Sequence, residues 1–163
     1  VFEEGETKVY RVGDPLPRAW VVYEVETASD QKAIAILNSE GFHPLHEAVV
    51  APDAAPANLP QAAGPGSPAQ VLEIRPGRLV LGVEPGGEGL LVISQPFYPG
   101  WRATVDGEPA PIHKVDYLLQ AVQVQSTSRK VVLSYRLSPL PGIVSLVFLL
   151  TCVALVLVER RRA

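Results

Sequence analysis

The chain has 163 residues, enough for one hydrophobic core of ordinary size, so we expect one domain followed by a tail. A formal net charge of -3, with no stripe of lysine and arginine in the β-rich part, gives no reason to expect nucleic acid as a partner. The single cysteine, Cys152, excludes an internal disulfide, and its apolar surroundings favour a packing role. The chain lacks methionine, begins at Val1 and opens without a signal-peptide pattern, so we expect it to be the C-terminal part of a longer protein.

The first third of the chain predicts short strands. Residues 7–12 mix β-forming residues with charged ones, and residues 45–51 form a further predicted strand. In residues 21–26, Val21, Tyr23 and Val25 alternate with glutamates. This alternation predicts a strand with one solvent-facing side.

One short helix is predicted over residues 31–39. Ser29 or Asp30 is suited to cap its N-terminus, and Gly41 is suited to end it. The predicted apolar side consists of Ala33, Ile34 and Leu37. A helix this short needs the sheet to stabilise it.

Residues 52–70 are rich in proline, alanine, glycine and serine, with Leu59 as the only large apolar residue. Such a segment buries too little surface to offset the entropy of ordering it. We interpret it as a mobile loop between two strands of one domain, of unusual length for a compact domain.

The remaining residues up to 136 predict an all-β domain. Residues 71–75, 79–83, 122–125 and 130–136 alternate apolar with polar side chains, as strands with one buried side do. Residues 90–93 are apolar at every position, which predicts a central strand with a layer on each face. Many short strands separated by turn signals favour a mainly β fold, a β-sandwich with one short helix.

Two turn signals enclose a predicted strand at residues 101–105. Pro99 and Gly100 suit a type II turn, because proline fixes φ at the first central position and glycine supplies a positive φ at the second. Asp106 and Gly107 suit the two-residue type I′ turn of a hairpin. We expect these four residues to serve the turns themselves.

The end of the chain differs from the rest in its apolar composition. Residues 142–158 carry no charge, and together with residues 137–141 they reach the length of about 20 residues that crosses a bilayer core of roughly 30 Å. We expect a transmembrane helix at residues 137–159, and the arginines of the tail, residues 160–163, place that tail in the cytoplasm. The domain of residues 1–136 then lies outside the cell membrane. The alternative, a core helix, would need an interior that a small all-β domain does not have.

Three segments carry a resemblance to a known family. They are Pro17-Arg18-Ala19-Trp20, the stretch of residues 98–107 (YPGWRATVDG), and the hydrophobic segment that follows Ser134-Tyr135-Arg136. Together they resemble the C-terminal region of the YfhO-type bacterial membrane proteins, over nearly the whole chain. The resemblance implies a multi-spanning glycosyltransferase of the GT-C kind, which uses polyprenyl-phosphate sugars at the outer membrane face and is linked to glycosylation of cell-surface polymers. It implies a catalytic acidic residue in an early extracytoplasmic loop that this chain lacks, so no catalytic residue is carried over.

Several residues of the matched segments are candidates for binding a glycan. They are Tyr98, Trp101, Arg102, Tyr117, Arg18 and Trp20. Aromatic rings can stack on sugars, and arginine can pair with a lipid phosphate or with a nearby aspartate, Asp106 or Asp116. The competing interpretation for Trp101 is structural, a side chain that closes the end of the sandwich.

Evidence for chemistry within this chain is weak. His43 and His46 have a spacing that suits a metal, yet only Glu47 is a nearby further ligand, so we expect no metal and no cofactor. His113 falls on a predicted strand and is expected to point outward. The sequence contains no phosphate-binding loop and no nucleophile elbow, and it does not imply that any two carboxylates lie close together.

The sequence therefore predicts a non-catalytic extracytoplasmic domain and membrane anchor of a YfhO-like protein. Its expected partners are the bilayer, the upstream transmembrane domain and a glycan or cell-surface polymer. An alternative is a single-pass, membrane-anchored adhesion module without an attached enzyme. A third possibility, a hydrolase, would require Trp101 and Asp106 to be essential for an activity without being essential for folding.

Overall fold

The structure, a computed structural model, describes residues 2–4, 7–9, 13, 15–56 and 64–136. Within these residues the chain forms fourteen short strands and one helix. In chain order they are β1 (Phe2–Glu4), β2 (Thr7–Val9), β3 (Ala19–Val22), β4 (Glu24–Thr27), α1 (Asp30–Leu37), β5 (Glu47–Val50), β6 (Ser67–Pro68), β7 (Gln70–Arg75), β8 (Arg78–Gly82), β9 (Gly89–Pro96), β10 (Trp101–Val105), β11 (Glu108–Ala110), β12 (Ile112–Val115), β13 (Leu119–Val124) and β14 (Lys130–Tyr135).

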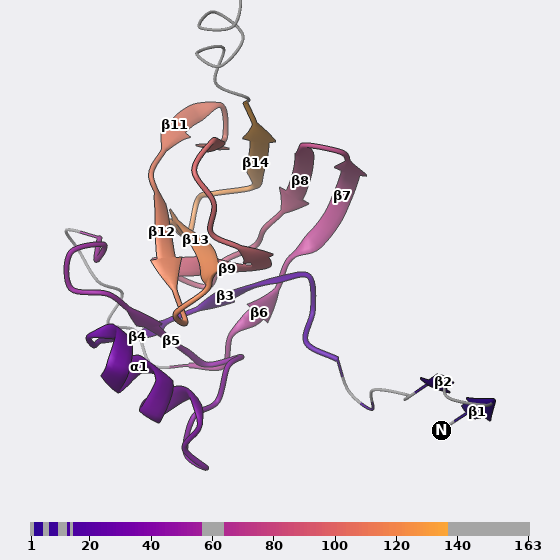
Figure 1. The fold of residues 1–163 in the computed structure, drawn as a ribbon. Coiled ribbons are helices and arrows are strands. Elements are labelled where there is room, and N and C mark those ends of the chain that lie inside the picture. The colour runs from indigo at the N-terminus through magenta and orange to yellow at the C-terminus, as the bar shows by residue number, and fades with distance from the viewer. Residues whose placement is uncertain (1, 5–6, 10–12, 14, 57–63, 137–163) are drawn as a thin grey trace, which may run out of the picture.

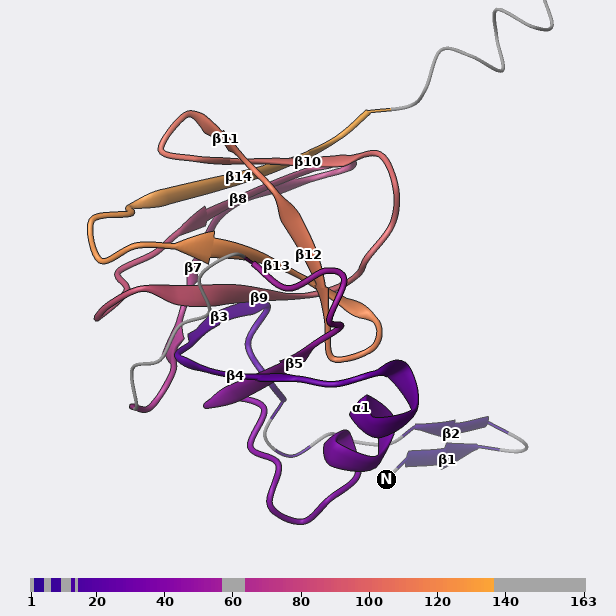
Figure 2. The ribbon, with the colours of Figure 1, turned by 90° about the vertical axis from the view of Figure 1, so that its left-hand side faces the viewer.

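The strands form two main sheets and one separate hairpin (Figure 1). One main sheet has five strands in the order β11-β10-β14-β8-β7, and the other has seven in the order β4-β5-β12-β13-β9-β3-β6. Figure 2 shows β10, β14 and β8 layered over β9 and β3. The predicted mainly β architecture with one short helix is confirmed; β1 and β2 pair with each other and belong to neither main sheet.

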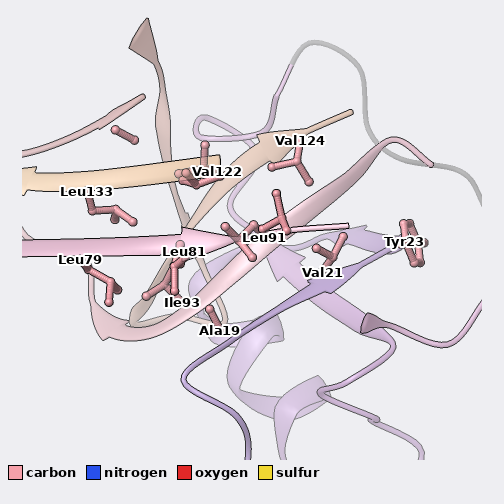
Figure 3. Packing of buried hydrophobic residues seen from close by; sticks show 13 residues of the cluster. Ala19, Val21, Tyr23, Leu79, Leu81, Leu91, Ile93, Val122, Val124 and Leu133 are labelled. Carbon is pink, nitrogen blue, oxygen red and sulfur yellow. The ribbon is translucent and has the colours of Figure 1, made fainter. Parts of the chain in front are cut away.

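The main core lies between the two sheets (Figure 3). From the five-stranded sheet come Leu79, Leu81, Val131 and Leu133, and from the seven-stranded sheet come Val21, Leu91, Ile93, Val122 and Val124, all of them buried. The alternation predicted for β13 and β14 supplies much of this core. Burial of each such aliphatic side chain stabilises the fold by about 1.5–3 kcal/mol relative to exposure.

Strand β9 contributes to a second core as well. Leu91 and Ile93 face the main core, whereas Leu90 and Val92 belong to a cluster on the opposite face of the sheet, where Trp20 also lies. The prediction of a central strand that is apolar on both faces is confirmed. The second cluster exists because the seven-stranded sheet curls.

The curl brings the two ends of the seven-stranded sheet together. Trp20, on β3, donates its indole N–H to the carbonyl oxygen of Pro44, just before β5, at 2.6 Å. Gly66, just before β6, lies so close to the carbonyl oxygen of Leu45 that no side chain fits there. Only glycine permits this approach of two backbones.

The prediction of one strand at residues 21–26 is wrong, because this segment contains parts of two strands, β3 and β4. All residues of β3 are buried, because β3 has neighbours on both sides and a core on each face. The chain leaves this position at Tyr23, whose hydroxyl oxygen accepts the N–H of Gly86 at 2.7 Å. Strand β4 then pairs in parallel with β5 at the other end of the sheet, in the register Glu24↔Glu47.

The helix begins as predicted but differs in its end and its buried side. Ser29 occupies the N-cap position without a side-chain hydrogen bond, and α1 ends at Leu37 with Asn38 as the C-cap. Asn38 ends the helix before Gly41, because its side-chain amide donates to the carbonyl oxygen of Ile34 at 2.7 Å. Ala33 packs against Val49 and Ala28, with Ile36 and Leu37 beside them, whereas the predicted core residue Ile34 is 45% exposed.

Two further expectations are corrected by the sheets. The apolar residues of β7 do not enter the core: Leu72 is 53% and Ile74 is 62% exposed, because β7 is the edge strand of the five-stranded sheet. The predicted loop at residues 52–70 contains a strand, since β6 pairs with β3 through Trp20↔Pro68 and Val21↔Ser67. Its residues 57–63 lie outside the described residues.

The predicted transmembrane helix at residues 137–159 and the tail at residues 160–163 also lie outside the described residues. In the part of the chain that is described, no helix has both the length and the apolar character needed to cross a bilayer. The described chain ends at Arg136, directly after β14.

The β10–β11 turn is fixed to the neighbouring β13–β14 turn by one aspartate. Asp106 has a φ of 50° and Gly107 a φ of 97°, as a type I′ turn requires. The Asp106 carboxylate accepts the backbone N–H groups of Arg129, at 3.1 Å, and Lys130, at 2.8 Å. Its own N–H donates to the carbonyl oxygen of Lys130 at 2.8 Å.

We predict that Asp106→Ala lowers the free energy of unfolding by about 1–3 kcal/mol, because it removes both carboxylate acceptors and places alanine at a positive φ. Urea unfolding monitored by circular dichroism measures this. Asp106→Asn, which retains an acceptor oxygen and tolerates this φ, should lose less. An alanine variant as stable as the wild type would contradict the assignment.

One fully buried side chain, that of Gln120, is a glutamine. Gln120, on β13, is fully buried opposite Ile93, and neither polar atom of its side chain has a hydrogen-bonding partner among the described residues. Burial of an unpaired amide costs about 1–3 kcal/mol.

We therefore expect Gln120→Leu, a change of similar volume, to raise the free energy of unfolding by about 1–2 kcal/mol. The control is Gln125→Leu just beyond the same strand, where the side chain is exposed and stability should stay within about 0.5 kcal/mol. Chemical denaturation of both variants gives the comparison, and a destabilised Gln120→Leu variant would show that this amide is needed.

Candidate functional site

A groove of about 720 Å³ runs over β10, which lies next to the edge strand β11 of the five-stranded sheet. The turn before β10, with Phe97, Tyr98 and Pro99, borders it, as do residues 109–112 of the β11–β12 connection. Its other lining residues are Trp101, Arg102, Ala103, Thr104, Ser134 and Arg136. The volume lies in the range of about 300–1,000 Å³ that is typical of pockets for small ligands.

Three aromatic rings are packed together at one end of this groove. The ring centroid of Tyr135 lies 5.4 Å from that of Trp101, in an edge-on arrangement, and 6.2 Å from that of Tyr98. Gly100 permits the packing, because its φ is 107° and a Cβ atom there would lie 2.8 Å from Cε2 of Tyr135. Trp101 is half-buried against the main core, whereas Tyr98 is 61% exposed.

Trp101 packs against the main core, as the structural interpretation expects, and it also lines the groove. Tyr98 presents its ring to solvent beside it. Such pairs offer an apolar face with a polar edge.

The groove is cationic. Arg102 and Arg136 line it and are both exposed, and none of the described residues that line it is acidic. Arg102 comes from β10 and is the register partner of Ser134 on β14, so both strands contribute polar groups to the groove. The aspartates considered as partners of Arg102 are engaged by backbone groups: Asp106 by Arg129 and Lys130, and Asp116 by Val49.

Arg18 and Trp20 lie outside this groove. Trp20 is 1% exposed and presents no ring face to solvent. Arg18 donates to the carbonyl oxygen of Ser94 at 3.0 Å and to Oε1 of Gln95 at 3.2 Å. These two residues form the irregular end of β9 that leads to Phe97, so Arg18 fixes the segment that enters the groove.

Tyr117 also lies away from the groove, in the β12–β13 turn. It has a φ of 65°, is 46% exposed and lies beneath the ammonium group of Lys114, 4.9 Å from its ring centroid. Tyr98 and Tyr117 are thus two exposed tyrosines, of which the first alone lines the groove.

The three histidines lie in two separate places, with His43 near His46 and His113 on β12. The rings of His43 and His46 lie 5.9 Å apart, and within the described residues no group of three metal-ligating side chains forms. The expectation that His113 points outward is wrong. Its ring is half-buried, because the 51–55 segment folds over β12 and the carbonyl oxygen of Ala54 lies 2.7 Å from its Nδ1 atom.

Sequence reasoning missed part of the groove, namely Phe97, Ser134 and Arg136. Phe97 lies directly before the recognised motif, and its backbone N–H donates to the carbonyl oxygen of Leu118 at 2.7 Å. The positions of Ser134 and Arg136 follow from alternation with the core residue Leu133. Their place in the groove depends on the pairing of β14 with β10, for which the sequence holds no local signal.

One half-buried carboxyl group lies in the β12–β13 turn. Asp116 has a φ of 49°, and its Oδ1 accepts the N–H of Val49 at 2.8 Å. Burial raises the pKa of the Asp116 carboxyl from 3.8 to about 6; the hydrogen bond from Val49 opposes this rise, and the charge of Glu47 adds to it. Because the folded chain holds this proton more tightly than the unfolded chain, this group reduces stability as the pH rises from about 4 to above 6.

We predict that Asp116→Asn removes this pH dependence, because asparagine keeps an acceptor for Val49 and tolerates a positive φ. The free energy of unfolding of the variant minus that of the wild type should be up to about 3 kcal/mol larger above pH 6 than near pH 4. Urea unfolding across this pH range measures the change. Asp53→Asn, at an exposed aspartate of the 51–55 segment, is the control, and a difference between Asp116→Asn and the wild type that is independent of pH would contradict the prediction.

The polar groups of the groove are of two kinds. Among the described residues that line it there is no aspartate, glutamate, histidine, lysine or cysteine; the polar side chains are arginines and hydroxyls. Such a set can stack on a ring, donate hydrogen bonds and neutralise an anion. No protein-family model, no curated protein and no solved structure matches the chain.

Proposed function

We propose that this chain is the non-catalytic extracytoplasmic end of a YfhO-like membrane protein, a glycosyltransferase that acts on cell-surface polymers. In this proposal the groove over β10 holds an acidic sugar of the polymer. The chemistry takes place elsewhere in the same polypeptide, upstream of Val1.

The observation that carries the proposal is the combination of groups in the groove. Tyr98 and Trp101 contribute aromatic side chains to its lining, and Arg102 and Arg136 contribute basic ones, with no acidic residue among the described lining residues. Sugars present apolar ring faces and hydroxyl groups, and acidic sugars add an anion that arginine binds in a bidentate manner. A neutral or cationic small molecule would leave both arginines without an opposite charge.

The position of the groove along the chain supports a role at a membrane. Arg136 lines the groove and directly precedes residues 137–158, none of which is charged. If residues 137–159 cross the bilayer, the groove lies near the outer surface of the membrane, where a lipid-linked or growing polymer is processed.

Binding of a small acidic sugar tests this proposal. The full chain in detergent micelles is titrated with the hyaluronan disaccharide, which carries one carboxylate, and with neutral diacetylchitobiose. We expect the acidic sugar to bind preferentially, and Arg102→Ala to weaken its binding by about tenfold or more through loss of a charge-assisted hydrogen bond.

The two exposed tyrosines provide a matched control. Tyr98→Ala should weaken binding of the disaccharide, whereas Tyr117→Ala, a loss of the same side chain outside the groove, should leave it unchanged. Absence of binding, or equal effects of both substitutions, would overturn the assignment of the groove. An upstream reading frame that encodes only a signal peptide would favour the adhesion module and refute the attached enzyme.

A further inference from the structure

A second groove lies next to the first. It has a volume of about 670 Å³, and its polar lining includes Asp30, Asp53, His113 and Lys114. These residues come from the start of α1, the 51–55 segment and β12. None of these four residues was a candidate binding residue from the sequence.

The second groove has fixed walls. His113 holds the 51–55 segment through Ala54, and within this segment the N–H of Ala54 donates to the carbonyl oxygen of Ala51 at 3.0 Å. On the helix side, the ammonium group of Lys114 lies 3.4 Å from the carboxylate of Asp30. These contacts lie on the two sides of the groove.

The two grooves share Phe97 and Ile112, which line both of them. Phe97 is 39% exposed, so an aromatic ring is accessible at the junction. Strand β12 connects them directly: Ile112 belongs to both grooves, and Lys114, two residues further along, belongs to the second, a distance of about 7 Å. A ligand that fills the first groove can therefore extend across Phe97 into the second.

The charges of the two grooves differ. The first contains two arginines and no acidic lining residue among those described, whereas the second contains Lys114 with Asp30 and Asp53. A chain with an anionic group at every position would meet repulsion in the second groove. A chain in which acidic and uncharged sugars alternate can place its carboxylate at the arginines and an uncharged ring beyond Phe97.

We propose that the two grooves form one extended binding surface for a linear glycan of several sugars, with an acidic sugar in the first groove and an uncharged sugar in the second. This inference rests on the proposed function and names its substrate class: a chain rather than a terminal monosaccharide or disaccharide. Either groove alone has the volume of a single small-ligand site, and only a longer molecule occupies both.

The test is a length series. The full chain in detergent micelles is titrated with hyaluronan oligosaccharides of increasing length, from disaccharide to tetrasaccharide to hexasaccharide, in which glucuronate alternates with an uncharged sugar. We expect the affinity to rise by about tenfold or more between the disaccharide and the longer chains, because the second contact is intramolecular once the first is made.

The variants separate the two grooves. Lys114→Ala should remove the gain with length and leave binding of the disaccharide unchanged, while Arg102→Ala should weaken all lengths. Arg78→Ala is the matched control, because Arg78 on β8 is also a basic residue paired with a carboxylate, that of Glu73 at 3.4 Å, and lies outside both grooves.

The outcomes distinguish the two proposals. If the disaccharide binds and longer chains bind no better, the extended surface is refuted and the proposed function stands. The same conclusion follows if Lys114→Ala leaves the gain with length intact. If no oligosaccharide binds to the wild type, the proposed function itself fails. Circular dichroism of each variant establishes that a loss of binding is not a loss of folding.

Discussion

The whole structure depends on burying both faces of β9. Leu90, Leu91, Val92 and Ile93 are fully buried, so each face of this strand needs a covering layer. The five-stranded sheet covers one face, and the curled ends of its own sheet cover the other, closed by the hydrogen bond from Trp20 to Pro44. With both faces committed to packing, binding groups are left to the segments beyond the core, the turn before β10 and the strands β10 and β14.

The sequence predicts local features well and distant pairings poorly. Strand β10 and the turns at its ends follow from Gly100 and from Asp106 with Gly107, whose conformations are set within a few residues. The split between β3 and β4 could not be predicted, because β4 pairs with β5 across the intervening helix. Tyr98, Trp101 and Arg102, which are close together in the sequence, line one groove. The more distant candidates Arg18, Trp20 and Tyr117 lie elsewhere.

The cationic character of the groove arises from strand pairing. Arg102 and Arg136 are far apart in the sequence and line one groove because β10 and β14 are antiparallel neighbours, with Trp101 opposite Tyr135. The same pairing packs Tyr135 against Trp101 and against Gly100. The pairing of these two strands therefore positions both the aromatic cluster and the two arginines.

The different surroundings of the two tryptophans in the chain give the molecule two internal spectroscopic probes. Trp20 is sealed inside the curled sheet, so its fluorescence should be emitted at short wavelength and should report on unfolding alone. Trp101 is half-buried at the groove, where polar neighbours and an arriving ligand can alter its emission. Quenching by a small solute should therefore affect Trp101 first, and occupancy of the groove should shield it while the signal from Trp20 stays constant.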